Sequence, residues 1–459
     1  MPRLCFAAGT LVLEGFEEES LPLALKLLTT VDDRIGSRRA RAVDYAPIVL
    51  SLRAAKMEFT DDAAHFSPLP GLQLHSTFSP RPHQKAAFAA WRAGHYRGIA
   101  ALPTGSGKTF LAAMAIVHLR RPTLVLAPTI DLVQQWVTAL EGFFQMEIGM
   151  LGGGEHKLLP ITVSTYDSAV LQMEFIGGDY AFLIFDECHH LSGQAYQTAA
   201  AMSIAPYRLG LTATPECTDE CRAILNDLAG PVVCQVHIDQ LEGEVLSPYR
   251  VETLELQLEP DERARYEEAR RIYTDFLKRH GVTFQAPNDW RRFLLLIARE
   301  PDGRAVFQAF MEQRRISRSG EAKMQAVWAL LKKHCGERMI IFTADNTAAY
   351  EIGRRFILPV LTHHTKLSER KKMLENFRAG IWPVLVTSKV LNEGVDVPQV
   401  NVGVIVSGSG SIREHVQRLG RILRAAPGKE EAVMYELLNS NTAEVHVSRR
   451  RREHRAYQR

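Results

Sequence analysis

A glycine-rich turn between two apolar stretches carries the strongest chemical signal in this chain. Residues 102–109 read Leu-Pro-Thr-Gly-Ser-Gly-Lys-Thr and precede an apolar helix predicted at 110–114. Backbone N–H groups in such a turn can surround a phosphate at the N-terminus of a helix. Lys108 would then reach the β and γ phosphates, and the hydroxyl of Thr109 would bind Mg²⁺. The turn predicts a nucleotide site, although Leu102 stands where the generic pattern begins with glycine.

Two acidic residues directly follow another apolar run. Residues 181–185 read Ala-Phe-Leu-Ile-Phe, and Asp186 and Glu187 come next. An apolar strand that ends in two carboxylates places them at the carboxyl edge of a parallel sheet, where ligands bind in this class of fold. We expect Asp186 to hold Mg²⁺ through water and Glu187 to polarise the attacking water. Together with the phosphate loop, the two acids predict hydrolysis of ATP.

These groups need an α/β framework to position them. Short apolar runs alternate with helical stretches, which is typical of a parallel sheet covered by helices. The first series of predicted strands lies at 98–102, 123–127, 161–164, 181–185 and 208–212. A second series lies at 339–342, 383–386, 402–406 and 433–437. The fold class is therefore α/β, with two parallel-sheet lobes.

The pattern divides the chain into five parts. Residues 1–74 form a small N-terminal α/β module, with two short strands around a Gly-Thr turn, a helix near 21–28 and a basic turn at 38–41. The remaining parts are a first lobe at 75–245, a connector with a helical insert at 246–320, a second lobe at 321–445 and a basic tail at 446–459.

The composition excludes several classes of protein. The chain has 459 residues, of which 46% are hydrophobic and 23% charged, as in a globular protein of about three domains. No apolar run approaches the ~18 residues that span a bilayer, and the N-terminus lacks a signal-peptide core. Six scattered cysteines favour a reducing, intracellular setting. Net charge is +3, but six arginines lie in residues 449–459, so a nucleic-acid ligand would need local grooves on a slightly acidic body.

The motifs together resemble those of superfamily 2 helicases, over roughly residues 78–440. Residues 81–84 (Arg-Pro-His-Gln) resemble the adenine-sensing segment of that family, and residues 417–424 resemble its last motif. The resemblance implies two RecA-like lobes with ATP and Mg²⁺ between them. It also implies that Arg421 and Arg424 reach the γ-phosphate, where a guanidinium from a second lobe stabilises the charge of phosphoryl transfer.

The resemblance assigns a role to each motif residue. The catalytic residues are Lys108, Glu187, Arg421 and Arg424. The nucleotide-binding residues are Arg81, Gln84, Thr104, Gly105, Ser106, Gly107, Lys108, Thr109, Gly394, Asp396 and Gln417. The Mg²⁺ ligands are Thr109 and Asp186, and the residues that couple hydrolysis to movement are His189, Thr212 and Thr214. The DNA-binding residues are Pro128, Thr129, Thr165, Thr343 and Thr387. The threonine hydroxyls would contact phosphates without reading sequence, although each one singly could equally be a helix cap.

Several longer stretches resemble one branch of this family, the XPB (xeroderma pigmentosum group B) helicases, above all their compact prokaryotic forms. These stretches are residues 164–169, 183–190, 202–214 and 408–411. The branch implies an ATP-dependent DNA helicase or translocase that moves 3′ to 5′ in nucleotide excision repair or transcription-linked DNA opening. It implies DNA and a candidate nuclease as partners, and a cytoplasmic location, or a nuclear one in a eukaryote. It also makes the N-terminal module damage-recognition-like and the helical insert thumb-like.

One element departs from the branch. XPB helicases carry an Arg-Glu-Asp element after the coupling motif, where this sequence has Cys217, Thr218 and Asp219. Because that element is associated with strand opening, the sequence leaves duplex unwinding open while it predicts ATP hydrolysis.

Other interpretations remain. An RNA helicase, an ATP-switched nucleic-acid clamp and a motor subunit of a restriction or remodelling system share the nucleotide site. Cys188 and His189 stand where DEAD-box RNA helicases have Ala and Asp, which argues against that class, and Glu187 with the two motif arginines argues against a clamp without excluding it. No nuclease or methylase motif supports the restriction or remodelling subunit. A zinc site could use the spacing of Cys217, Cys221, Cys234 and His237, although cysteines beside a strand are more often buried apolar residues.

Overall fold

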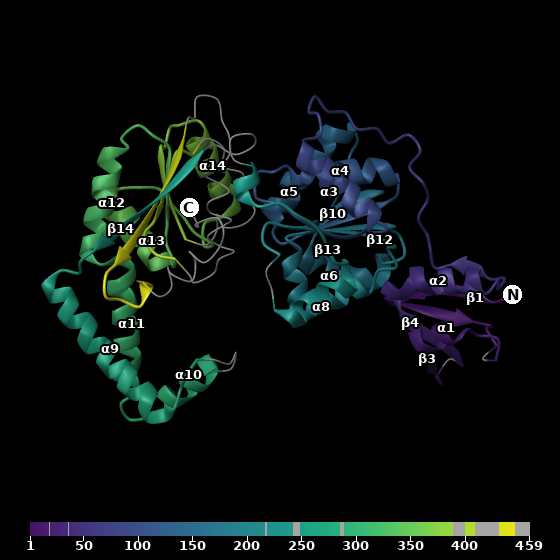
Figure 1. Cartoon of the computed structure of the whole chain (residues 1–459), viewed down its shortest axis with the longest axis horizontal. Coiled ribbons are helices and arrows are strands. Elements are labelled where there is room, and N and C mark those ends of the chain that lie inside the picture. The colour runs from purple at the N-terminus through teal and green to yellow at the C-terminus, as the bar shows by residue number, and fades with distance from the viewer. Residues whose placement is uncertain are drawn as a thin grey trace. The chain divides into compact units, whose positions relative to one another are not determined.

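The computed structural model describes residues 1–17, 19–34, 36–215, 218–241, 248–284, 289–388, 400–408 and 431–445. The chain forms two compact units, Met1–Gln240 and Leu241–Arg459, each with its own sheets and cores (Figure 1). Among the helices described, none is both long and apolar enough to cross a membrane.

The first unit begins with a five-stranded sheet in the N-terminal module, in the order β3-β4-β2-β1-β5. Its strands are β1 (Arg3–Ala7), β2 (Thr10–Glu14), β3 (Thr29–Asp32), β4 (Ser37–Arg41) and β5 (Thr60–Asp62). Helix α1 (Leu23–Leu28) lies between β2 and β3 in the sequence, and α2 (Tyr45–Ala54) lies between β4 and β5. The alternating apolar residues of β1 and β2 pack with α1 and α2 into one core, which includes Leu4, Leu11, Leu25 and Ile48.

The basic turn predicted at 38–41 is wrong, because these residues form strand β4, paired with both β2 and β3. The arginine side chains donate hydrogen bonds to residues of the neighbouring strands. Arg39 donates to Asp32 Oδ2 at 2.8 Å and to Thr10 Oγ1 at 2.8 Å, and Arg38 donates to Thr29 Oγ1 at 2.6 Å. Paired charges on the neighbouring strands therefore let a basic segment join the sheet.

The rest of the first unit is an eight-stranded sheet in the order β13-β6-β12-β11-β7-β10-β8-β9, parallel except for β9. Its strands are β6 (Arg97–Ala101), β7 (Thr123–Ala127), β8 (Gly149–Gly152), β9 (Glu155–Lys157), β10 (Ile161–Thr165), β11 (Phe182–Asp186), β12 (Tyr207–Thr212) and β13 (Val232–Gln235). The central strands are buried on both faces, as the continuous apolar runs predicted.

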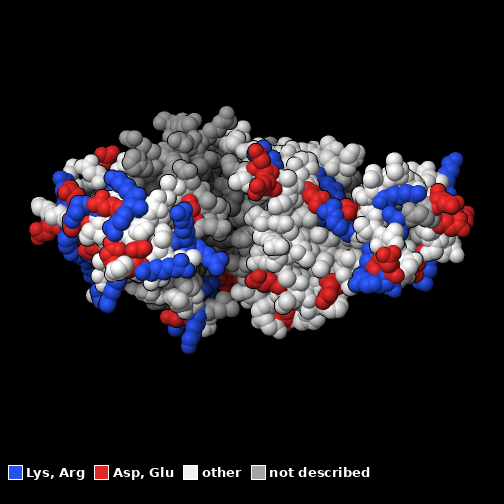
Figure 2. Space-filling view, turned by 90° about the horizontal axis from the view of Figure 1, so that it is seen from below, with Lys and Arg blue, Asp and Glu red and all other residues white. Residues whose placement is uncertain are grey.

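Helices cover both faces of this sheet, and two separate cores lie beneath them (Figure 1). The helices α3 (Pro82–Ala93), α4 (Lys108–Leu119) and α5 (Ile130–Phe144) pack over one core. The helices α6 (Tyr166–Ile176), α7 (Gln194–Ala201) and α8 (Asp219–Leu228) pack over the other. The short 3-10 helix η2 (Cys188–Ser192) follows β11. The side that carries α6 and α8 shows few charged side chains in Figure 2.

The second unit has a parallel six-stranded sheet in the order β14-β19-β18-β15-β17-β16. Its strands are β14 (Tyr249–Leu256), β15 (Met339–Phe342), β16 (Val360–Leu361), β17 (Val384–Thr387), β18 (Val402–Ile405) and β19 (Ala432–Asn439). Helices α12 (Glu321–Lys333), α13 (Asn346–Phe356) and α14 (Leu367–Arg378) connect the strands. Between β14 and α12 lie α9 (Pro260–His280), α10 (Asp289–Arg299) and α11 (Gly303–Ser319), so the stretch predicted as a helical insert is helical where it is described.

The α/β fold class is confirmed, and each predicted strand agrees with the structure to within two residues at either end. Most of the strands that sequence reasoning missed have four or fewer residues or lie at sheet edges, and β4 was missed because it is rich in arginine. The missed strands are β3, β4, β5, β8, β9, β13, β14 and β16.

Candidate functional site

The phosphate loop lies between β6 and α4, at the carboxyl edge of the large sheet. Gly105 and Gly107 both have a φ of +85°, a left-handed conformation that glycine adopts without steric cost. A Cβ atom at Gly107 would overlap the amide nitrogen Nε2 of Gln84. The loop therefore needs glycine at this position, and its backbone curves as a phosphate cradle at the start of α4 requires.

Gln84 lies behind the loop and is buried. Its Nε2 donates to the carbonyl oxygens of Ser106 at 3.0 Å and Gly107 at 3.2 Å, and its Oε1 accepts from the backbone N–H of Arg81 at 2.9 Å. His83 Nε2 also lies 2.8 Å from the Ser106 carbonyl oxygen. The predicted adenine-sensing segment is thus fastened to the phosphate loop, while contact of Gln84 and Arg81 with a base stays a prediction.

Lys108, Asp186 and Glu187 meet at this edge of the sheet. The Nζ of Lys108 lies 3.6 Å from Glu187 Oε1 and donates to the carbonyl oxygen of Leu102 at 3.4 Å. Both side chains of the Lys108–Glu187 pair are largely buried. An ammonium and two carboxylates from two neighbouring motifs therefore share one small region, as the sequence predicted.

Asp186 is held by two aromatic residues to which the sequence analysis assigned no role, although Tyr166 lies within the resembling stretch 164–169. Trp136 of α5 donates from Nε1 to Asp186 Oδ2 at 2.7 Å, and Tyr166 of α6 donates to the Asp186 backbone carbonyl at 2.9 Å. The N–H of Glu187 donates to Asp186 Oδ1 at 3.1 Å. Burial, followed by the negative charge of Glu187, raises the pKa of Asp186, and the positive charge of Lys108 opposes that rise. Trp136 and Tyr166 are thus supporting residues that sequence reasoning missed.

Glu187 has the features of a side chain that binds a ligand. Its φ of +47° and ψ of +54° are left-handed, a strained conformation for a residue with a side chain. Its Oε2 is buried and accepts no hydrogen bond from the described residues, and the buried Oγ of Ser106 has none either. His189 Nδ1 lies 3.6 Å from Glu187 Oε2. These polar atoms fit a site that binds a triphosphate with Mg²⁺, for which Thr109 and Asp186 could supply the protein oxygens.

Two of the three predicted coupling residues, Thr212 and Thr214, lie at the end of β12, next to the phosphate loop, whereas His189 lies in η2. Thr212 and Thr214 are buried, and Thr212 Oγ1 donates to the Thr214 carbonyl at 3.1 Å and accepts from its N–H at 3.2 Å. The N–H of Leu102 donates to the Thr212 carbonyl at 2.8 Å. Strand β6, which leads to the phosphate loop, and strand β12, which leads to the threonine pair, are therefore hydrogen-bonded to each other at their carboxyl ends.

Two of the predicted DNA-binding threonines cap helices. Thr129 Oγ1 accepts from the N–H of Leu132 at the start of α5, and Thr165 Oγ1 accepts from Ser168 N–H at the start of α6. Both are half-buried, as is the neighbouring Pro128. They lie at the same carboxyl edge of adjacent strands β7 and β10, where helix N-termini favour phosphate.

The two threonines of the second unit are buried. Thr343 donates to the carbonyl oxygens of Asp345 at 2.9 Å and Thr387 at 3.2 Å, and Thr387 donates to the Leu361 carbonyl at 3.1 Å. These hydroxyls shape the ends of β15 and β17. Phosphate contact at these strand ends stays a prediction.

Several predicted residues lie outside the described part of the chain. They are Gly394, Asp396, Gln417, Arg421, Arg424 and Cys217, together with most of 408–411 and the tail at 446–459. Among the residues that are described, no group of three or more His, Cys, Asp or Glu side chains could hold a metal ion.

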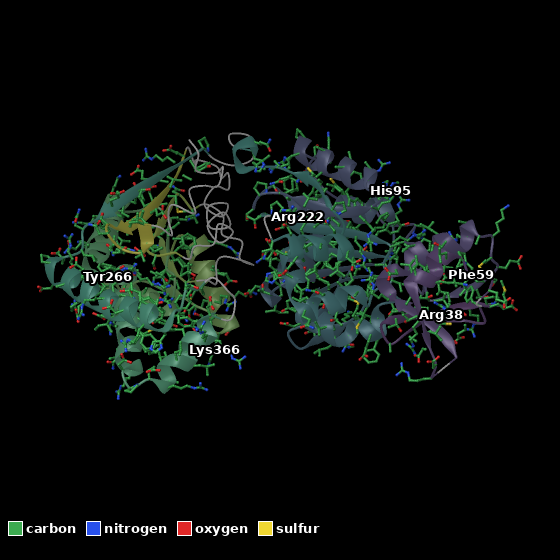
Figure 3. The ribbon with its side chains drawn as sticks, turned by 60° about the horizontal axis from the view of Figure 1, so that its bottom comes forward. Arg38, Phe59, His95, Arg222, Tyr266 and Lys366 are labelled. Atoms are coloured by element: carbon green, nitrogen blue, oxygen red, sulfur yellow. The ribbon has the colours of Figure 1, made fainter. Side chains whose placement is uncertain are left out.

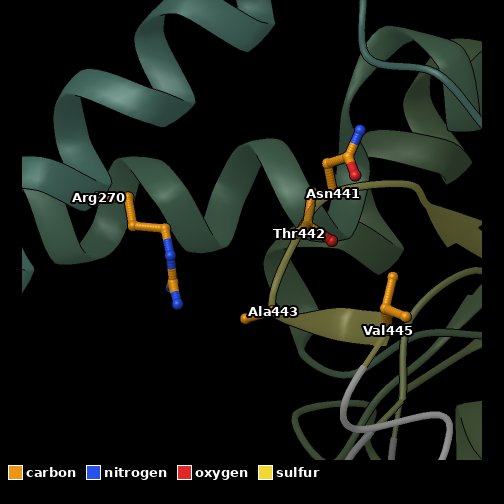
Figure 4. Close-up of a pocket in the computed structure, with 5 residues that line it drawn as sticks. All are labelled: Arg270, Asn441, Thr442, Ala443 and Val445. Carbon is orange, nitrogen blue, oxygen red and sulfur yellow. The ribbon is translucent and has the colours of Figure 1, made fainter.

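One pocket of about 350 Å³ lies in the second unit. Its lining residues come from α9 and from the segment after β19, with the Arg270 side chain extending beside Ala443 in Figure 4. It is lined by Arg270, Asn441, Thr442, Ala443 and Val445. None of these residues belongs to a predicted motif.

Comparison with protein families gives three matches along the chain. The family described as "Xeroderma pigmentosum group B helicase damage recognition domain" matches residues 4–63. "Type III restriction enzyme, res subunit" matches residues 77–217, and "ERCC3/RAD25/XPB C-terminal helicase" matches residues 308–458. Two of the three families are thus specific to XPB.

Relatives and solved structures agree with these matches. The chain is 35% identical over 421 residues to the DNA 3′-5′ translocase XPB2 of Sulfurisphaera tokodaii, covering 92% of this chain and 95% of that protein. It is 28% identical over 408 residues to the DNA 3′-5′ helicase XPB of Mycobacterium tuberculosis, covering 86% of this chain but only 66% of that protein. The Pyrococcus furiosus Hef helicase domain has the same fold, with a TM-score of 0.55 and 20% identity over 80% of this chain and 97% of that one. The nucleotide-site motifs, the RecA-like fold and the close relative together show that this chain belongs to the XPB family of superfamily 2 helicases.

Proposed function

We propose that this chain is an ATP-driven motor that moves 3′ to 5′ along DNA. The observation that carries the proposal is the buried cluster of Lys108, Asp186 and Glu187 beside the phosphate loop, in a chain of the XPB family. The curated relatives at 35% and 28% identity are named as a DNA 3′-5′ translocase and a DNA 3′-5′ helicase.

The chemistry of the proposed site is ATP hydrolysis. Lys108 would balance the charge of the β and γ phosphates, and Glu187 would orient the attacking water and accept its proton. Mg²⁺ bound by Thr109 and Asp186 would neutralise charge on the phosphate oxygens. The 3.6 Å between Lys108 Nζ and Glu187 Oε1 leaves the lysine free to exchange the carboxylate for phosphate when ATP binds.

The remaining roles of the motif residues are part of the proposal. Arg421 and Arg424 would stabilise the γ-phosphate, and Gly394, Asp396 and Gln417 would contribute to nucleotide binding. His189, Thr212 and Thr214 would pass the state of the nucleotide to the DNA-binding edge, since they adjoin both Glu187 and the phosphate loop.

The cellular setting follows from the family. A module that matches a damage recognition family supports a role in DNA repair, and transcription-linked DNA opening is the other setting in which an XPB-type motor would act. A nuclease is the candidate partner that would cut DNA opened by this motor. We place the protein where chromosomal DNA lies, in the cytoplasm of a prokaryote or the nucleus of a eukaryote.

Steady-state ATPase assays test the proposal. The wild type is measured alone, with single-stranded DNA, with duplex DNA and with RNA, and is compared with Glu187→Gln. Glu174→Gln serves as the matched control, because Glu174 is an exposed glutamate in the same lobe. We expect DNA to stimulate the wild type and the control more than RNA does, and Glu187→Gln to lose at least ~100-fold in kcat, because it removes a general base.

Two outcomes would contradict the proposal, and a third would narrow it. Stimulation by RNA alone would replace DNA with RNA as the substrate. A DNA-stimulated rate that does not depend on DNA length would indicate an ATP-switched clamp rather than a translocase. If the protein displaces a third strand from duplex DNA but does not unwind a 3′-tailed duplex, its activity is limited to translocation. We test this because Cys217, Thr218 and Asp219 replace the element associated with strand opening.

A further inference from the structure

Three arginines from three different elements converge on the C-terminal end of α8. Arg41 of β4 donates to the Asp227 carboxylate, from Nη1 to Oδ2 at 2.8 Å and from Nη2 to Oδ1 at 3.2 Å. Arg97 of β6 donates to the Asp227 backbone carbonyl at 2.8 Å, and Arg208 of β12 donates to the Leu228 carbonyl at 2.7 Å. We call this set of five residues the α8 junction.

Charge explains why three cations gather here. The carbonyl groups at the C-terminus of a helix carry partial negative charge, and an acidic residue there is unfavourable unless a cation offsets it. Asp227 is such an acidic residue, and its bidentate partner Arg41 comes from the N-terminal module rather than from the first lobe. The same guanidinium also donates to Asp44 of the module, at 2.9 and 3.0 Å. Asp227 therefore stabilises the contact between the N-terminal module and the first lobe rather than α8 itself.

Arg208 fixes the junction to the interior of the first lobe. Its side chain is fully buried and donates to four carbonyl oxygens, those of Leu228 and of Ala205 at 3.0 Å, Ser203 at 2.7 Å and Ala200 at 3.1 Å. Burial lowers the pKa of Arg208 to about 9, so the group stays a cation at neutral pH. The ends of α7 and α8 are thus bound to one strand by one guanidinium.

The two strands that hold Arg97 and Arg208 lead directly to the nucleotide site. Arg208 and Arg97 are register partners in β12 and β6. At the other end of the same strands lie the phosphate loop and Thr212, which are also bonded to each other. The junction and the nucleotide site therefore occupy opposite ends of one rigid pair of strands.

The N-terminal module has further contacts with the lobe near the junction. The N–H of His65 donates to the Gly178 carbonyl at 3.0 Å, and Ile204 of the lobe belongs to the module's own apolar core. Gly9 lies so close to Met202 that a Cβ there would overlap its side chain. The module is therefore packed on the lobe at the ends of α6 and α7 as well as at α8.

We propose that the α8 junction couples the nucleotide site to the N-terminal module, with the Arg41–Asp227 ion pair as the transmitting contact. A shift of β6 and β12 on nucleotide binding displaces the end of α8, and the ion pair carries that displacement to β4. Asp227 and Arg41 are positioning residues, because neither touches nucleotide. The inference rests on the proposed function, which it deepens by naming how the module regulates the DNA-stimulated ATPase.

Exposure makes the ion pair suitable for a test, because Arg41 and Asp227 are 54% and 47% exposed and their replacement leaves the core intact. The variants are Arg41→Gln, Asp227→Asn and the double variant that carries both changes. Arg222→Gln is the matched control, since Arg222 lies on the same helix in an exposed ion pair with Asp219 at 3.7 Å (Figure 3). Each full-length protein is assayed for basal and DNA-stimulated ATPase, and for hydrogen exchange of residues 37–44 with and without AMP-PNP.

We expect the single variants to keep basal ATPase and to lose about threefold to fivefold of the DNA stimulation, the range that an exposed ion pair can supply. AMP-PNP should change exchange at 37–44 in the wild type and in Arg222→Gln but not in the single variants, and the double variant should lose no more than either single variant, because both changes break the same contact. Wild-type stimulation and exchange in the single variants would overturn the inference, and so would losses that add in the double variant. If DNA fails to stimulate the wild type, the proposed function fails, while the exchange measurement still decides the coupling.

Discussion

Replacing Trp136 by phenylalanine removes the indole N–H that donates to Asp186 Oδ2 at 2.7 Å. Trp136 is 3% exposed, so water cannot replace the lost donor. A hydrogen bond to an ionised group is worth about 1.5–3 kcal/mol, and the smaller ring adds roughly 1 kcal/mol of lost packing. We therefore expect the Trp136→Phe variant to lose about 3 kcal/mol of unfolding free energy.

The same change should affect the proposed metal site more than the chemistry. Residues that orient a metal ligand typically change metal affinity by about 10-fold or more when they are mutated. We expect the Mg²⁺ concentration at half-maximal ATPase to rise about 10-fold, while kcat at saturating Mg²⁺ stays within about threefold of the wild type. Glu187 and Lys108 remain in place, which is why turnover should survive.

The assay is a Mg²⁺ titration of DNA-stimulated ATPase, together with thermal unfolding. For a unit of this size, 3 kcal/mol corresponds to a fall in Tm of about 6–12 °C. Trp91→Phe is the matched control, because Trp91 is equally buried and donates from its indole to the Arg208 carbonyl at 2.9 Å, away from Asp186. The control should lower Tm and leave the Mg²⁺ dependence unchanged.

An unchanged Mg²⁺ dependence in Trp136→Phe would refute the reasoning, whatever happens to its Tm. An equal shift in both variants would refute it as well, because the effect would then follow general destabilisation rather than the orientation of Asp186.

Three further predictions follow from other parts of the first unit. Gly107→Ala should weaken binding of a fluorescent ATP analogue at least about 10-fold, because φ is +85° and the new Cβ would overlap Gln84 Nε2; wild-type affinity would contradict this. Arg208→Met should lower the unfolding free energy by about 3–5 kcal/mol in a denaturant titration, since several buried carbonyls lose their donor; a wild-type midpoint would show that these acceptors find other partners. Hydrogen bonds from Arg34, above all, lower the pKa of Asp32 to about 2. Because the folded pKa lies below the unfolded value of 3.8, this stabilisation is present above about pH 4 and lost as pH falls toward 2. Asp32→Asn should therefore flatten the dependence of Tm on pH across that range, and an unchanged slope would exclude Asp32 as its source.

The sequence was sufficient for the parts of the fold in which local pattern and final structure agree. Strands such as β7 and β11 are buried on both faces, so their residues are continuously apolar and their limits are visible in the sequence. The phosphate loop was equally visible, because its glycines and lysine are close together in the chain. The meeting of Lys108 with Glu187 followed from the rule that ligands gather at the carboxyl ends of parallel strands.

Other features depended on contacts between distant residues and could not be predicted. Trp136 looks like any aromatic residue on an amphipathic helix until β7 and β11 are known to be neighbours. The arginines of β4 suggested a turn because the sequence does not show Asp32 and Thr10 beside them. The role of Asp227 needs Arg41 and Arg97, which come from two other elements, and no local pattern marks such a residue.

The pairing of β14 with β19 has a consequence for how the protein is made. Tyr249 pairs with Ala432, so the partner of β14, the first strand in the sheet of the second unit, is synthesised only when nearly the whole unit has been made. The described strands of the first unit have all been synthesised by residue 235 and can assemble once they emerge from the ribosome, while translation continues. During that interval β14 presents an unpaired edge, which is a template for aggregation. Synthesis that stalls between the two strands should therefore yield a folded first unit joined to an aggregation-prone remainder, and chaperones would be needed most in that interval.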